Sequence, residues 1–175
     1  MKAQIWAIDF ATSVIIFAIG IVVVLFAFNG LADSTGQELE SSRMQDRALE
    51  VTESFVRTAG LPLGWTSSDV TAIGLAQEYN ETDASTGVRE NVLDSSKVLA
   101  FVSPNLDYNK SKAIMDISNY EYYFWMEHIN GTQVSLQGVD IVKGTNFASA
   151  RNVVIVERHV ILSEVIMKLE FVLWQ

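Results

Sequence analysis

The hydrophobic residues of this chain follow two patterns, one continuous and one periodic. Residues 10–28 (FATSVIIFAIGIVVVLFAF) form the continuous pattern and contain no charged residue. A helix of this length, at ~1.5 Å per residue, spans ~28 Å, which matches the hydrocarbon core of a bilayer. Because it is apolar around its whole circumference, only lipid or other helices can cover it. The pattern predicts a membrane-spanning helix that can also join a bundle of helices.

The segment that follows keeps a helical period but is apolar on one side only. Small or apolar residues recur there at spacings of three and four, which places them on one helical face. They are Met44, Ala48, Val51, Phe55 and Ala59. Charged residues occupy the opposite side, and Gly60 followed by Pro62 is a typical helix end. We therefore predict an amphipathic helix over 37–59 that packs one face on a sheet.

Weak helix formers separate the two halves of this helical region. They are Gly20, Asn29, Gly30 and Gly36. Glycine in a helix interior is unfavourable by about 1 kcal/mol relative to alanine. We expect bends or melted turns at these positions.

The C-terminal third of the chain predicts a sheet. Residues 120–129 are aromatic and β-prone, and Asn130-Gly131 is a typical hairpin turn into 132–137. Residues 153–162 and 165–174 flank a short turn, and 165–174 alternates as an antiparallel strand buried on one side does. The predicted fold class is α+β, with a long N-terminal helix (apolar, then amphipathic) packed on a C-terminal antiparallel sheet of about four strands.

Shorter elements connect the helix to the sheet. We predict a polar loop over 77–91 and helices over 94–102 and 107–116. No repeat or linker separates a further domain. The chain is thus divided into an N-terminal membrane-anchor or filament-core helix, residues 1–32, and an extracellular α+β domain, residues 33–175.

Charges around the apolar run favour one orientation in a membrane. Lys2 precedes the run, and acidic residues follow it at positions 33, 38 and 40. The positive-inside tendency places the N-terminus in the cytoplasm and the rest of the chain outside. The alternative is a secretory signal cleaved near Gly30-Leu31-Ala32, but the apolar core of such signals usually has about 7–15 residues. A retained helix is therefore favoured.

The composition argues against several functional classes. The chain has 12 Lys and Arg against 21 Asp and Glu, a net charge of −9, which disfavours nucleic acid as a partner. It has no cysteine, so disulfides, thiol nucleophiles and cysteine-based metal sites are excluded. Two histidines, His128 and His159, are too few for a histidine-rich metal centre. We expect no metal and no cofactor.

Catalytic motifs are also missing from the sequence. Either histidine could join Asp140 or Glu157 and a serine in a hydrolase-like triad. However, the chain has no GxSxG, HExxH or Walker-type motif, and histidines in strands are more often packing residues. An enzyme such as a membrane-tethered hydrolase is therefore not expected.

An aromatic cluster lies at the start of the first C-terminal strand. Its members are Tyr120, Tyr122, Tyr123, Phe124 and Trp125. Such rings can stack on a sugar or a base, or they can fill a core. We expect them to form the sheet core beneath the amphipathic helix.

The order of these features resembles that of type IV pilins and pilin-like proteins, the archaeal members above all. Lys2-Ala3-Gln4 is similar to the site at which archaeal prepilin peptidases cut, and the resemblance implies that Gln4 is the first mature residue. The segments GLPLGW, VTAIGLA and DSSKVLAF also look like a recurrent set in archaeal proteins of this layout. Bacterial-type pilins have Glu at the fifth mature position, whereas this chain has Ile8 there and Asp9 next.

The resemblance implies a structural subunit of an extracellular type IV pilus-like filament at the cell surface, used for adhesion. It implies self-association as a helical homopolymer, a membrane-anchored precursor, and a prepilin peptidase, an assembly ATPase and its platform as partners. The residues expected in the filament core are Phe10, Ile15, Phe17, Ile19, Val22 and Phe26. The alternative is a single-pass surface protein that does not polymerise: a minor pilin, an assembly factor or a binding module.

Asp9 lies at the start of the apolar run. A carboxylate at mid-membrane is unfavourable by up to about 3 kcal/mol, and by less near the interface. Lys2 of the same helix is ~10 Å away along the axis. A cation on an axially shifted neighbouring subunit, Lys2 or the free N-terminal amine, is therefore one expected partner. Solvation among lipid headgroups is the other.

Three Asn-x-Ser/Thr sequons follow the apolar run. They begin at Asn80, Asn109 and Asn130, and none has proline in the middle. Each falls in a predicted loop, turn or helix start, where glycan acceptors of extracellular domains lie. N-linked glycans are the non-protein groups that the sequence suggests.

Overall fold

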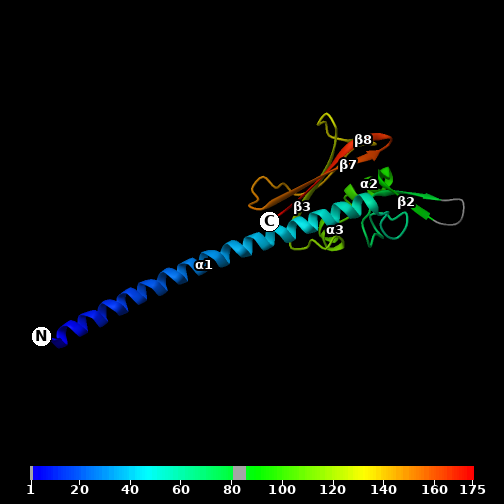
Figure 1. Ribbon diagram of the computed structural model, residues 1–175. Helices are drawn as coiled ribbons and strands as arrows, with labels where there is room; N and C mark the ends of the chain where they lie inside the picture. The colour runs from blue at the N-terminus through cyan, green and yellow to red at the C-terminus, as the bar shows by residue number, and fades with distance from the viewer. Residues whose placement is uncertain (1, 81–85) are drawn as a thin grey trace. The chain divides into compact units, whose positions relative to one another are not determined.

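The computed structural model describes the backbone of residues 2–80 and 86–175, and the side chains of 10–27, 39–79 and 87–175. The chain divides into two compact units, residues 1–42 and 43–175. Figure 1 labels the three helices and several of the strands. The first unit is helical throughout its described residues, and the second contains the last turns of the same helix, two short helices and the strands.

Helix α1 (Lys2–Arg57) has no interruption. Gly20, Asn29, Gly30 and Gly36 all have helical backbone, so the expected melted turns do not occur. Each of these residues weakens a helix by only about 1 kcal/mol or less, which is too little to interrupt a helix of 56 residues. Gly60 follows the helix in the left-handed region, with φ +76°, as the predicted helix end requires.

The main sheet has six strands in the order β1-β2-β7-β8-β3-β6. They are β1 (Ala76–Asn80), β2 (Thr86–Leu93), β3 (Glu121–His128), β6 (Val142–Gly144), β7 (Val153–Leu162) and β8 (Val165–Trp174). All neighbouring pairs are antiparallel except β2 and β7, which are parallel. The sheet is therefore mostly antiparallel, and the α+β class is confirmed, although the expected number of about four strands is wrong.

The last two predicted strands of the chain are confirmed. Strands β7 and β8 cover 153–162 and 165–174 and pair along their whole length. Their connection, Ser163-Glu164, has positive φ at both residues, +51° and +67°, as tight hairpin turns between twisted strands do. The predicted helices are confirmed as α2 (Ser95–Val102) and α3 (Tyr108–Ile114), which begin after the capping carboxylates of Asp94 and Asp107.

Two predictions in the sheet are wrong. The expected strand over 132–137 is reduced to β4 (Ser135–Leu136), which pairs with β5 (Val139–Asp140) outside the main sheet. The place beside β3 is taken by β6 instead. The polar loop expected over 77–91 contains most of β1 and β2, because a hairpin at the end of a sheet, with most of its described side chains only partly buried or exposed, needs no apolar alternation.

One edge of β7 is only partly covered. Strand β2 pairs with it only at Val92–Ile161 and Leu93–Leu162. Within the described residues, 153–160 have no strand partner on that side. Strand β7 thus behaves as an edge strand over most of its length.

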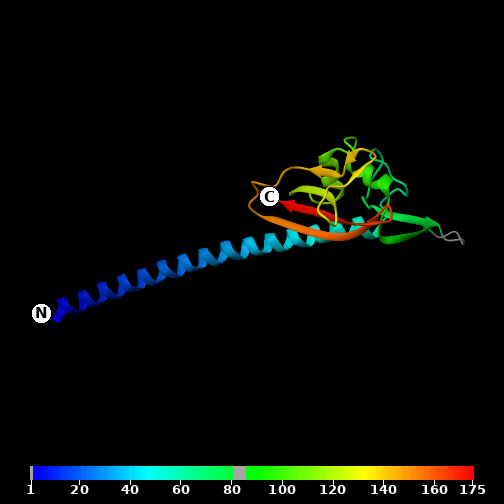
Figure 2. The same cartoon turned by 90° about the horizontal axis from the view of Figure 1, so that it is seen from above.

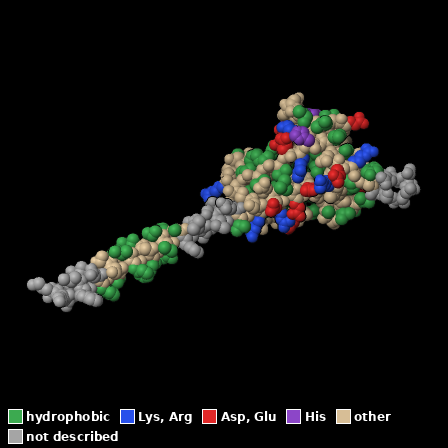
Figure 3. All heavy atoms as spheres, in the orientation of Figure 1, with side chains coloured by type: hydrophobic (Ala, Val, Ile, Leu, Met, Phe, Trp, Pro, Cys, Tyr) green, Lys and Arg blue, Asp and Glu red, His purple; other side chains and the backbone are tan. Residues whose placement is uncertain are grey.

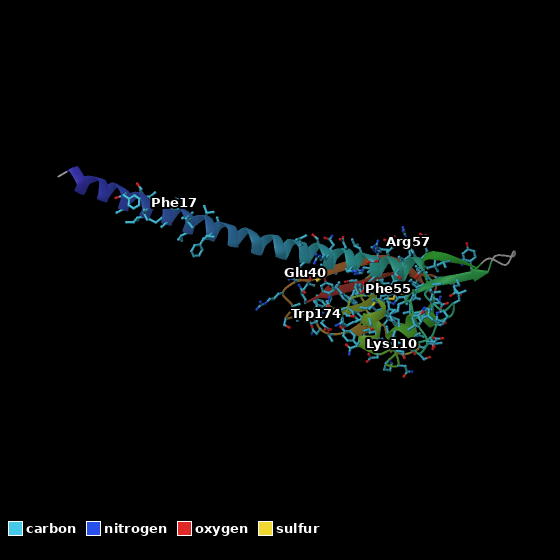
Figure 4. The ribbon with its side chains drawn as sticks, turned by 90° about the horizontal axis from the view of Figure 1, so that it is seen from below. Phe17, Glu40, Phe55, Arg57, Lys110 and Trp174 are labelled. Atoms are coloured by element: carbon cyan, nitrogen blue, oxygen red, sulfur yellow. The ribbon has the colours of Figure 1, made fainter. Side chains whose placement is uncertain are left out.

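The core lies between α1 and one face of the sheet (Figure 2). All five residues of the predicted amphipathic face are buried, as expected. Phe55 makes edge-to-face contacts with Phe101 of α2, Phe124 of β3 and Phe171 of β8, with ring centroids 5.2–5.8 Å apart. Figure 4 shows Phe55 on the sheet side of α1 and Arg57 on the other side.

Lys143 of β6 is a half-buried cation beside this core. Its ammonium donates to the backbone oxygens of Leu106, at 2.6 Å, and Ser103, at 3.3 Å, and lies 5.5 Å from the centre of the Phe101 ring. Burial lowers the pKa of Lys143 to about 8, and the negative charge of Asp107 opposes this shift.

This pKa predicts a pH-dependent stability. Between pH 8 and 10.5 the unfolded chain binds more protons at position 143 than the folded chain, so the contribution of Lys143 to stability rises with pH. We expect the stability of the wild type relative to Lys143→Met to increase across this window. Urea unfolding of both full-length chains in detergent at pH 7.5 and 10.5 measures it, and a constant difference would contradict the prediction.

Candidate functional site

The apolar segment is the first candidate site. Phe10–Ala27 is, among the described residues, the one helical stretch long and apolar enough to cross a membrane, a property that N-terminal signal sequences share. None of its 18 residues is buried within the chain. Figure 3 shows hydrophobic side chains along this segment. Such a surface is stable only when lipid or other helices cover it.

The six residues expected in a filament core are all exposed. Their exposed fractions range from 51% for Val22 to 76% for Phe26. At 3.6 residues per turn, Phe10 and Phe17 lie on one side of the helix, and the other four lie on the opposite side. They are Ile15, Ile19, Val22 and Phe26. The segment therefore offers apolar contact in more than one direction.

The predicted processing and charge residues lie at the start of α1. The side chains of Lys2, Ala3, Gln4 and Asp9 are outside the described residues, although their backbone is helical. Cleavage before Gln4 and an ion pair between Asp9 and a neighbouring cation both remain predictions.

The aromatic cluster of β3 is divided between the two faces of the sheet. Tyr120, Tyr122 and Phe124 are buried, as expected. Tyr123 and Trp125 are only half-buried and lie on the other face, so the expectation that they fill the same core is wrong. The reason is the two-residue period of a strand, which sends neighbouring side chains to opposite faces.

The outward-facing rings form a second candidate site. Phe147, from the loop before β7, lies 6.0 Å from Tyr123 and 6.3 Å from Trp125 between ring centroids. Tyr123 and Trp125 line a pocket of about 270 Å³ together with Glu127, Gly131 and Gln133. We call it the β3 aromatic pocket. Sequence reasoning missed Phe147, because nothing in its local pattern connects it to β3.

Polar groups border the β3 aromatic pocket. The Glu127 carboxylate accepts hydrogen bonds from Lys168 Nζ and from Trp125 Nε1, each at 3.0 Å. The hydrogen bond from Lys168 is the main cause that lowers the pKa of Glu127 below its usual value. The pocket therefore combines aromatic surface with an ionised acceptor, a combination that suits a ligand with both apolar faces and hydroxyl groups.

The three sequons differ in their surroundings. Asn80 ends β1 rather than lying in a loop, and its side chain is outside the described residues. Asn109 is exposed in α3, but its sequon partner Ser111 is fully buried, with its hydroxyl 2.6 Å from that of Tyr122. Asn130 and its partner Thr132 are both exposed. In the folded domain, Asn130 is thus a more accessible acceptor than Asn109.

The two histidines are not brought together. In the strand register His128 lies opposite Met167, whereas His159 lies opposite Lys168, so they are on opposite faces of the sheet. Among the described residues, no hydrogen bond joins either imidazole to a serine, and no three metal-ligating side chains gather. The nearest acid to His159 is Glu157, at 3.7 Å. This arrangement gives no support to the hydrolase-like triad.

Comparison with known proteins supplies no relative from which a role could be transferred. The sequence matches no family model, no curated protein and, as a fold, no solved structure.

Proposed function

We propose that this chain is a structural subunit of an extracellular filament of the archaeal type IV pilus kind, which polymerises through its apolar N-terminal helix and serves adhesion. The observation that carries the proposal is the exposure of the whole Phe10–Ala27 surface within the chain. A bilayer covers this surface in the precursor, and the same segments of other copies cover it in the filament.

The physics of this transfer explains the proposed assembly partners. Lipid tails are as apolar as a bundle of helices, so moving the segment from bilayer to filament brings little hydrophobic gain. Extraction therefore needs an energy source, which is the role of the assembly ATPase and its platform. A prepilin peptidase would first remove the residues before Gln4, on the cytoplasmic side.

Asp9 sets the axial offset between neighbouring helices in the proposed filament. In a bundle of staggered helices its carboxylate would be withdrawn from water, where an unpaired charge is strongly unfavourable. Lys2 or the new N-terminal amine of an axially shifted subunit would neutralise it. In the precursor the same carboxylate lies near the headgroups.

One experiment tests both the filament and its processing. Electron microscopy of material sheared from cells that express the protein should show filaments, and intact-mass analysis should find this chain in them, beginning at Gln4. A membrane-retained chain in cells without filaments would favour the non-polymerising surface protein. A chain beginning at Asp33 would establish a cleaved signal and refute the proposal.

A further inference from the structure

The turn that carries Asn130 is tightly ordered. Gly131 has φ +84°, and His128 and Thr132 close the turn with a backbone hydrogen bond of 2.8 Å. The Asn130 side-chain oxygen accepts from the Thr132 amide at 3.0 Å and from its hydroxyl at 2.8 Å. Within the described residues the Asn130 side-chain nitrogen has no hydrogen-bond partner. A substituent on this nitrogen therefore breaks no existing hydrogen bond.

The same turn closes one end of the β3 aromatic pocket. Gly131 lines the pocket next to Asn130 in the chain, and Gln133 lies opposite Glu127 across a β-bridge. Trp125 lies two residues from Glu127 on the same strand face, about 7 Å away at the usual rise of a strand. A chain of sugars that leaves Asn130 thus starts at the rim of a pocket lined by rings.

The chemistry of the pocket matches that of a saccharide. A pyranose has apolar C–H faces, which pack on aromatic rings, and hydroxyl groups at its edge, which donate hydrogen bonds. Tyr123 and Trp125 supply the rings. The Glu127 carboxylate supplies a charged acceptor, and hydrogen bonds to charged acceptors are roughly twice as strong as neutral ones.

We propose that the glycan attached to Asn130 folds back onto β3 and that its first sugars occupy the β3 aromatic pocket. One sugar face packs on Trp125, and a hydroxyl group donates to Glu127. The glycan then acts as a part of the domain that holds the turn 128–132 on the sheet. The inference rests on the extracellular location in the proposed function, because N-glycosylation requires export.

A double-mutant cycle tests this contact. The full-length chain is produced in an N-glycosylating host, purified in detergent, and compared before and after enzymatic removal of glycans. We expect deglycosylation to lower the Tm of the wild type by about 2–4 °C, the shift expected for 1 kcal/mol in a chain of this size. The same treatment should leave the Tm of Trp125→Ala unchanged, while Trp125→Phe, which keeps a ring, retains part of the shift.

Two matched variants locate the effect. Asn130→Gln should lose the Tm shift even when Asn80 or Asn109 carries a glycan. Ile166→Ala, which removes an exposed side chain from the same sheet face outside the pocket, should retain it. Amide exchange of residues 128–132 should accelerate about fivefold on deglycosylation of the wild type but not of Trp125→Ala, since that factor corresponds to 1 kcal/mol.

Two results would overturn the inference. The first is an equal Tm shift in the wild type and Trp125→Ala, because the glycan would then stabilise the domain without the pocket. The second is a chain from the glycosylating host that carries no glycan at Asn130. Filaments are scored separately, so a chain that forms filaments without this glycan refutes the inference and leaves the proposed function standing.

Discussion

Cells that express the Val22→Asp variant are expected to have no filaments, while the second unit of the chain still folds. Val22 lies near the middle of the apolar segment, and its side chain is exposed within the chain. In a bundle of helices the new carboxylate would be buried without a partner, a cost of several kcal/mol in every subunit. Electron microscopy of sheared material measures the effect, and immunoblotting of the membrane fraction shows that the chain is made and inserted.

Val22→Leu is the matched control, because it changes the shape of the same side chain without adding a charge. It should give filaments in normal numbers. Phe26→Asp repeats the test one turn further along the helix. Filaments of normal abundance from either aspartate variant would refute a core built from this segment.

The second large effect concerns the core of the globular unit. Phe55→Ala should lower the free energy of unfolding by about 3–5 kcal/mol, because it removes a fully buried ring and leaves a cavity. Three aromatic residues from three different elements would lose their contact with α1. Urea unfolding of the full-length chain in detergent, followed by near-UV circular dichroism, measures the loss.

Leu49→Ala provides the control for this variant. Leu49 lies on the same helix, and its side chain is 38% exposed, so its truncation leaves no closed cavity. We expect a loss below about 1 kcal/mol. Equal losses from the two variants would show that α1 does not pack on the sheet through Phe55.

The elements with strong local signals could be predicted from the sequence. The period of four and three placed four residues of α1, and Ala59 just after its end, in the core, and all five are buried. Strands β7 and β8 have the predicted limits because a turn with left-handed residues separates two long β-prone runs. Helices α2 and α3 each begin directly after an aspartate cap.

The other elements depend on contacts that no local pattern contains. Strands β1 and β2 form a polar hairpin at one end of the sheet, and the three residues of β6 form a strand only because β3 lies beside them. The parallel contact between β2 and β7 joins segments about 70 residues apart. Whether such residues form strands depends on their tertiary contacts and not on their own β-propensity.

The candidate sites show the same division. The apolar segment could be identified from the sequence alone, because its length and its lack of charged residues do not depend on contacts with other elements. The β3 aromatic pocket needs β3 and the turn at Gly131 to come together, and Phe147, which contacts its two rings, comes from a different loop. The sequons at Asn109 and Asn130 look alike in sequence. Only the structure shows that Ser111, the third residue of the Asn109 sequon, is buried against Tyr122.

The incompletely covered edge of β7 bears on how two copies of this chain can associate. Open strand edges are templates on which other chains can add a strand and aggregate. Strand β7 has charged or titratable side chains at the middle of its open edge, in Glu157, Arg158 and His159. Arg158 lies on the core-facing side and is half-buried, so a strand added at this edge would enclose a charge. If copies of this chain assemble as proposed, the enclosed charge would disfavour pairing between their sheet edges, and the apolar helix would remain as the route to ordered association.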